Sequence, residues 1–116
     1  MSGPYVHLHL HSEYSLLDST IRIPALVAAA AAAGMPAVAV TDESNLFALV
    51  KFYRAAEKAG IKPIAGCDAW IADPAGAPYR LTLLCQDRSG YRNLSVLLSR
   101  AYRERHGEHP IVRREW

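Results

Sequence analysis

Short apolar runs alternate with helix-forming stretches along this chain of 116 residues. The run 36–41 suits a buried strand, and the alanine-rich stretch 21–33 before it has high helix propensity. A chain that alternates strands with helices is expected to adopt an α/β fold with a mostly parallel sheet, because parallel strands need a crossover between them. The predicted order is strand, helix, strand, helix, strand, strand, helix, over residues 5–11, 21–33, 36–41, 46–59, 61–71, 79–86 and 89–105.

Residues that begin and end helices support these boundaries. Pro24 suits the first turn of a helix, and Gly34 is a natural stop after the alanines. The segment 42–45, Asp-Glu-Ser-Asn, supplies capping residues for the second helix, which Gly60 should end. An anion bound at Ser44-Asn45 is the alternative reading of that helix start.

Composition limits the classes of protein to which the chain can belong. Apolar residues make up 51% and charged residues 21%, as in a folded globular domain. The formal charge of +2 is too small to indicate a nucleic-acid partner, but residues 88–116 carry seven arginines and three glutamates, a net of +4. That segment is either a solvated basic helix or a contact for phosphate or an acidic partner, and both readings stay open.

The sequence predicts a cytoplasmic protein without a membrane segment. The first twenty residues lack an apolar stretch, and the apolar run 24–40 is too short and too broken to cross a bilayer. Cys67 and Cys85 lie in apolar runs without a CxxC pairing, so we expect buried, reduced thiols.

Three histidines alternate in the stretch YVHLHLHS near the start of the chain. In a strand, His7, His9 and His11 would form one row, since alternate side chains share a face. Carboxylates recur near the ends of the predicted strands, where functional groups of such sheets gather. Imidazole and carboxylate together suit zinc, manganese or iron, although packed or surface histidines remain the alternative. The carboxylates are Asp18, Asp42, Glu43 and Asp68.

Other polar and aromatic residues give weaker signals. His106 and His109 lie in a stretch with Gly107 and Pro110, which mark a loop, and are expected to be solvated. Trp70 is expected to pack rather than to stack on a base. No serine or cysteine has a His/Asp arrangement suited to nucleophilic catalysis, and no phosphate-binding loop is present.

Three stretches closely resemble the PHP (polymerase and histidinol phosphatase) domain: HLHLHSEYSLLDS, GMPAVAVTDESNLFALVKFYRAAEKAGIKPIAGCDAWIA and YRLTLLCQDRSGYRNLSVLLSRAY. The combination of TD-x-x-NL, KFY and AGIKPI-x-G is similar to the branch of the family found at the N-terminus of bacterial replicative polymerases, the DNA polymerase III alpha subunits. The resemblance covers residues 5–116.

This resemblance implies the first part of a distorted (β/α) barrel whose active members bind metal ions and hydrolyse phosphoesters. It implies that residues 1–116 are a single incomplete domain of a DNA-directed DNA polymerase, a nucleotidyltransferase with its Mg-dependent catalytic site elsewhere. The implied partners are the proofreading exonuclease subunit, other polymerase III holoenzyme subunits, and DNA through the parent polymerase. Too few strands are present to close a barrel, so sheet edges should be exposed.

Carried over by motif, the family's first metal ligands fall on His9, His11 and Asp18, with His7 deeper in the barrel and not ligating. The chain then departs from the pattern: Glu43 stands where the family has histidine, and Asp68 stands where it usually has glutamate. The family's last ligand motif, Asp-x-His, would lie beyond residue 116.

Arg80 is the most serious departure, because it replaces a histidine and brings a permanent positive charge toward a cation site. One hypothesis is that Arg80 takes the place of a lost metal and pairs with Asp18, Glu43 or Asp68; the alternative is that it points to solvent. The sequence therefore predicts a vestigial or weak metal site at His9, His11, Asp18, Glu43 and Asp68, with no tightly bound cofactor.

Two further readings stay open. If the site is intact, zinc or manganese would support a metal-dependent phosphoesterase or pyrophosphatase. A nucleic-acid-binding module would instead use Arg100, Arg103 and Arg105 and bind in a salt-sensitive way.

Overall fold

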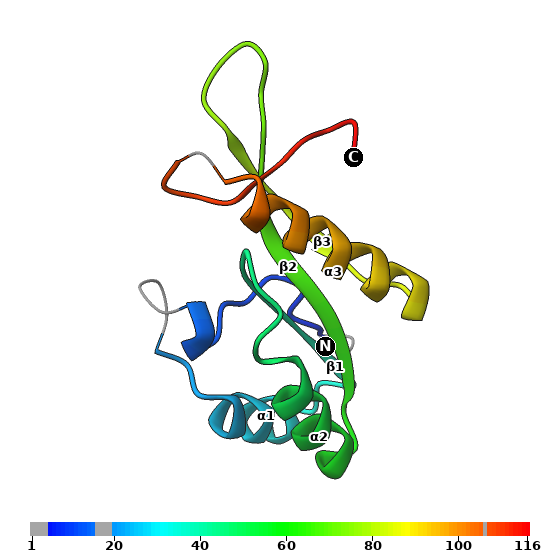
Figure 1. The fold of residues 1–116 in the computed structure, drawn as a ribbon. Helices are drawn as coiled ribbons and strands as arrows, with labels where there is room; N and C mark the ends of the chain where they lie inside the picture. The colour runs from blue at the N-terminus through cyan, green and yellow to red at the C-terminus, as the bar shows by residue number, and fades with distance from the viewer. Residues whose placement is uncertain (1–4, 16–19, 106) are drawn as a thin grey trace.

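A mixed sheet around one long strand organises the chain in a computed structural model that describes residues 5–15, 20–105 and 107–116 (Figure 1). Within these residues the elements are η1 (Glu13–Ser15), α1 (Ile23–Ala32), β1 (Ala37–Glu43), α2 (Leu49–Ala59), β2 (Lys62–Ile71), β3 (Tyr79–Leu84), α3 (Arg88–Arg103) and β4 (Ile111–Val112).

Strand β2 pairs with every other strand of this sheet. On one side β1 runs parallel to it, with Ala37 opposite Lys62 and Glu43 opposite Asp68. On the other side β3 runs antiparallel, with Asp68 opposite Thr82. Strand β4 pairs in parallel with the last two residues of β2, beyond the point where β1 ends. The predicted α/β fold with a mostly parallel sheet is therefore confirmed, whereas β4 was not predicted.

The helices begin and end for local reasons. Pro24 stands in the first turn of α1, and Gly34 and Gly60 follow α1 and α2 with φ of 73° and 75°, in the left-handed region that glycine adopts easily. The side chain of Asp87 caps α3 by accepting a hydrogen bond from the Gly90 amide at 2.8 Å.

The predicted start of α2 is wrong by three residues. Ala48 is the N-cap and has no side-chain capping bond. The Asn45 side chain is used in the preceding loop: its oxygen accepts from the Phe47 amide at 3.1 Å, and its nitrogen donates to the Tyr14 carbonyl at 3.0 Å. Ser44 and Asn45 therefore shape a loop after β1 instead of capping a helix.

Residues 5–11 do not form the predicted strand. The segment lies beside β1, with the Ala39 amide bonded to the His7 carbonyl and the Thr41 amide bonded to the Leu10 carbonyl. The Leu10 amide donates to the Thr41 hydroxyl at 2.9 Å. Between these two bonds the segment advances three residues, from His7 to Leu10, while β1 advances only two, from Ala39 to Thr41. A regular ladder of backbone hydrogen bonds therefore cannot form. His7 is exposed among the described residues.

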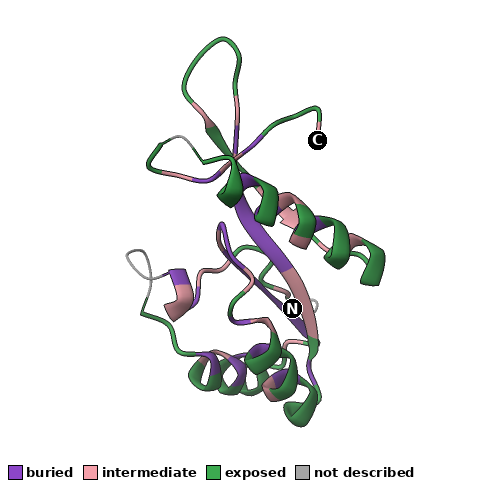
Figure 2. Ribbon diagram, in the orientation of Figure 1, coloured by how far each residue is buried: buried purple, intermediate pink, exposed green. Residues whose placement is uncertain are grey.

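Helices cover only one face of the sheet. By register, Val38 and Val40 of β1 point to the same face as Cys67 and Ala69 of β2. The two valines pack with α1 and α2, and Cys67 and Ala69 pack with α3. Figure 2 shows most of β1 and the second half of β2 as buried. The opposite face carries Asp68.

Two further features of the molecule bear on its surroundings. Among the described residues, β3 has no partner strand on its outer edge, and Tyr79 and Leu81 are exposed there. None of the helices in the described ranges combines the length and hydropathy needed to cross a membrane.

Candidate metal centre

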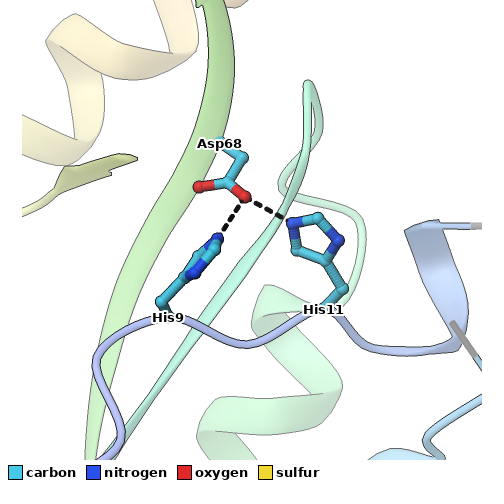
Figure 3. A group of neighbouring side chains, drawn as sticks. All are labelled: His9, His11 and Asp68. Atoms are coloured by element: carbon cyan, nitrogen blue, oxygen red, sulfur yellow. Dashed lines mark hydrogen bonds and ion pairs between the residues drawn. The ribbon is translucent and has the colours of Figure 1, made fainter. Parts of the chain in front are cut away.

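Successive side chains of β2 point to opposite faces of the sheet, and this places the Asp68 carboxylate on the face that the described helices do not cover. Cys67 and Ala69 point toward α3, so Asp68 between them must point to the other face. The segment that precedes η1 crosses this face and brings His9 and His11 to Asp68 (Figure 3).

Both histidine rings contact the same carboxylate oxygen. His9 Nε2 lies 2.6 Å and His11 Nε2 lies 2.5 Å from Asp68 Oδ2 (Figure 3). The His9 side chain is 64% exposed, whereas the side chains of His11 and Asp68 are 12% and 2% exposed. One ligand atom from each residue lies within 4.8 Å of the others, so His9, His11 and Asp68 form a group that could hold a metal ion.

Hydrogen bonds keep the buried Asp68 carboxylate charged. Burial on its own raises the pKa of Asp68, but hydrogen bonds from Thr82, His9 and His11 and the charge of His9 lower it below its ordinary value. The Thr82 hydroxyl donates to Oδ1 at 2.5 Å. Thr82 was missed by the sequence analysis, although it lies directly opposite Asp68 in the β2–β3 register.

The donor set fits a zinc or manganese ion in kind and in number. Two imidazole nitrogens and one carboxylate oxygen match the three protein ligands of a catalytic zinc site. Ligands of one tetrahedral zinc lie about 3.3 Å apart, so the two short contacts to Asp68 would have to lengthen on binding. Bound there, a metal ion would supply Lewis-acid activation of water or phosphate.

Arg80 lies beside this group without entering it. Its Nη1 is 4.0 Å from Asp68 Oδ2, which is an ion-pair distance but longer than a hydrogen bond. The guanidinium carbon lies 5.3 Å from the centre of the Trp70 ring, and the side chain is 43% exposed. Arg80 therefore adds positive charge near Asp68 while facing solvent in part.

Glu43 points to a different set of side chains. Its Oε1 accepts a hydrogen bond from Trp70 Nε1 at 2.9 Å and lies 3.9 Å from His109 Nδ1. His109 stacks on Trp70 with ring centroids 4.5 Å apart and its side chain is 39% exposed, so it is solvated only in part. Asp18 and His106 lie outside the described residues.

Asp42 holds in place the segment that follows His11. Its buried carboxylate accepts hydrogen bonds from the Ser12 amide at 2.5 Å, the Ser12 hydroxyl at 2.6 Å and the Ser15 hydroxyl at 2.9 Å. The sequence analysis treated Asp42 as a carboxylate at a strand end and as one of the capping residues of the second helix. Its part in positioning this segment depends on a contact across thirty residues, which no local pattern reveals.

The chain is similar to known proteins in sequence and in fold. A family model described as the PHP domain matches residues 7–116. The DNA polymerase III subunit alpha of Xylella fastidiosa (strain 9a5c) is 52% identical over 90% of this chain, and those of Pseudomonas aeruginosa and Escherichia coli K12 are 51% and 48% identical over all of it. The chain spans about a tenth of the length of these curated relatives, 10% in each case.

Two solved structures share the fold. One is named as a candidate metal-dependent phosphoesterase from Bifidobacterium adolescentis, with a TM-score of 0.70 and 20% identity over 90% of this chain and 35% of that one. The other is an amidohydrolase from Chromobacterium violaceum with bound sulfate and no metal, with a TM-score of 0.62 and 22% identity over 84% of this chain and 36% of that one.

Proposed function

Because this chain belongs to the PHP domain family, we propose that it is the N-terminal PHP segment of a DNA polymerase III alpha subunit. The observation that carries the proposal is the identity of 48–52% to polymerase subunits across most or all of the chain. In this proposal residues 1–116 are part of a PHP domain, and the Mg-dependent nucleotidyl-transfer site lies elsewhere in the polymerase.

The proposed role of the segment is structural. It would support the polymerase core and contact the proofreading exonuclease subunit and other holoenzyme subunits in the cytoplasm, with DNA bound through the parent polymerase. Support comes from the relatives themselves, each of which is named as a subunit of DNA polymerase III.

We further propose that the metal site is vestigial. Asp68 Oδ2 already accepts two imidazole contacts, and the Arg80 guanidinium adds a permanent positive charge at 4.0 Å. The Glu43 carboxylate is engaged by Trp70, away from the three other candidate ligands. These contacts can neutralise the buried Asp68 without a metal ion.

The test is the metal content of the whole natural protein, purified without chelator and measured by elemental mass spectrometry. The proposal expects zinc and manganese at background. Arg80→His restores the donor that the family usually has and should raise the metal content toward one per chain. Arg92→His, on the exposed surface of α3, is the matched control and should change nothing. About one tightly bound ion per chain in the natural protein would overturn the vestigial site.

An active metal-dependent phosphoesterase is the second candidate, and the convergence of His9, His11 and Asp68 within 4.8 Å favours it. It predicts hydrolysis of a chromogenic phosphomonoester in added zinc or manganese. Asp68→Asn should abolish that turnover, whereas Glu57→Gln on the exposed surface of α2 should not. Turnover equal in both variants would assign the activity to a contaminant.

A further inference from the structure

A groove lies between α2 and the beginning of α3, on the face of the sheet opposite the metal ligands. Its floor includes Pro63 and Ala65, which share the face of Cys67 in β2. Tyr53 of α2 and Tyr91 of α3 line its sides, and the cavity measures about 470 Å³. Because Ala65 is small, the two helices leave this space unfilled.

The apolar side chains along the groove are exposed to solvent. Val50 is 64% exposed and Tyr53 is 52% exposed, and both stand on the side of α2 that faces away from the buried Phe52. Tyr91 is 39% exposed, and Phe47, at the adjoining end of the same surface, is 68% exposed. A contiguous apolar surface of this kind is typical of a protein-binding site.

The rim of the groove is positively charged. Arg54 and Arg88 line it, and neither takes part in an ion pair within the described part of the chain. The one acidic residue of the lining, Asp87, has its carboxylate bonded to the Gly90 amide as a helix cap. Asp87 keeps its negative charge as a helix cap, so two arginines and one aspartate give the described lining a net charge of +1, which suits an acidic partner.

We propose that this groove binds a peptide segment of a protein partner that carries apolar side chains flanked by acidic residues. Leucine or aromatic side chains would fill the space over Pro63 and Ala65, and glutamate or aspartate would pair with Arg54 and Arg88. Two arginines over an apolar floor are too few for a nucleic-acid backbone, which needs a row of cations. This proposal does not depend on the proposed function, because none of the candidate metal ligands that the structure describes lines the groove.

The test is fluorescence anisotropy of the full chain with a labelled ten-residue peptide that alternates leucine and phenylalanine with glutamate. We expect saturable binding that Val50→Asp weakens about tenfold or more, because it removes an apolar contact and repels the acidic peptide. Val96→Asp is the matched control: Val96 is 59% exposed on α3 but does not line the groove, so its variant should bind like wild type. Circular dichroism of each variant checks that it folds.

Four outcomes would overturn the proposal. The wild type does not bind the peptide at millimolar concentration, or Val50→Asp and Val96→Asp bind it equally. If a single-stranded oligonucleotide binds the wild type more tightly than the peptide does, and Val50→Asp loses that binding, the groove is assigned to nucleic acid. Sedimentation that shows a dimer lost in Val50→Asp would assign it to a second copy of the chain.

Discussion

At the scale of single residues, close approach in the sheet leaves no room at Gly66. A Cβ atom on this residue would lie 2.6 Å from the Leu83 carbonyl oxygen, 2.8 Å from Leu84 Cδ2 and 3.0 Å from Thr41 Cγ2. These neighbours come from both strands that flank β2. The absence of a side chain at Gly66 thus allows β1, β2 and β3 to pack next to the metal ligands.

We therefore expect Gly66→Ala to lower the free energy of unfolding by about 1–3 kcal/mol, because the added methyl group displaces backbone. Urea denaturation measures the change. Gly76→Ala is the control, since its Cβ would approach nothing nearer than Asp73 at 3.8 Å. Equal stability of the two variants would contradict the crowding at Gly66.

The two cysteines should differ in reactivity. Cys67 is fully buried, and burial raises the pKa of its thiol to about 12, so almost no thiolate exists at pH 8. Burial also raises the pKa of Cys85, but this side chain is only half-buried. We expect a thiol reagent to label Cys85 in the native protein and Cys67 only after unfolding. Cys85→Ser should remove the native-state reaction, and a native-state reaction that persists in Cys85→Ser would contradict the burial of Cys67.

At the scale of elements, side chains add to the two backbone hydrogen bonds between β1 and the segment that carries the histidines. The Thr41 hydroxyl bonds the Leu10 amide, and the Asp42 carboxylate bonds the amide and hydroxyl of Ser12. His11 lies between these two anchored residues. The position of the ring therefore depends on two adjacent side chains at the end of β1.

Asp42→Asn should weaken this anchoring. One carboxylate oxygen that accepts hydrogen bonds becomes an amide nitrogen, which cannot accept a bond from the Ser12 or Ser15 donors. We expect a loss of about 1–3 kcal/mol in the free energy of unfolding, with faster hydrogen exchange at the Ser12 amide. Asp73→Asn, in an exposed turn where an amide oxygen can still accept from Ala75, is the control. Unchanged exchange at Ser12 would exclude this role of Asp42.

At the scale of the whole molecule, two groups of helices pack at different ends of β2. Helices α1 and α2 form one cluster with β1, and α3 forms the others with β2 and β4. The Cα radius of gyration is 15.0 Å, above the roughly 13 Å expected for a compact chain of this length. The ten residues of β2 join the two ends, so this strand transmits stability between them.

We predict that the two ends unfold together. Phe52→Ala removes a fully buried side chain of the α1–α2 cluster and should cost about 3–5 kcal/mol. Both tryptophans, Trp70 and Trp116, lie at the other end, in β2 and after β4. If β2 couples the ends, Phe52→Ala lowers the urea midpoint of unfolding by the same amount whether unfolding is followed by tryptophan fluorescence or by circular dichroism. A fluorescence midpoint that does not move would mean that the ends unfold separately.

Local patterns in the sequence predicted much of the fold and part of the site. The alanine run, Gly34 and Gly60 predicted where α1 and α2 end, and the apolar runs predicted β1 and β2, because propensity and strand period act over a few residues. The sequence also singled out His9, His11 and Asp68, which the structure brings together.

The remaining features depend on contacts between distant segments, and only the tertiary structure decided them. Strand β4 exists because β2 extends past the end of β1 and leaves an edge to pair with. Glu43 bonds Trp70, with His109 stacked against the same ring, instead of turning to Asp68. The sequence alone determined which groups could serve as ligands. The tertiary structure decided which of them meet, because side chains of similar chemistry compete for partners that come together only when the sheet forms.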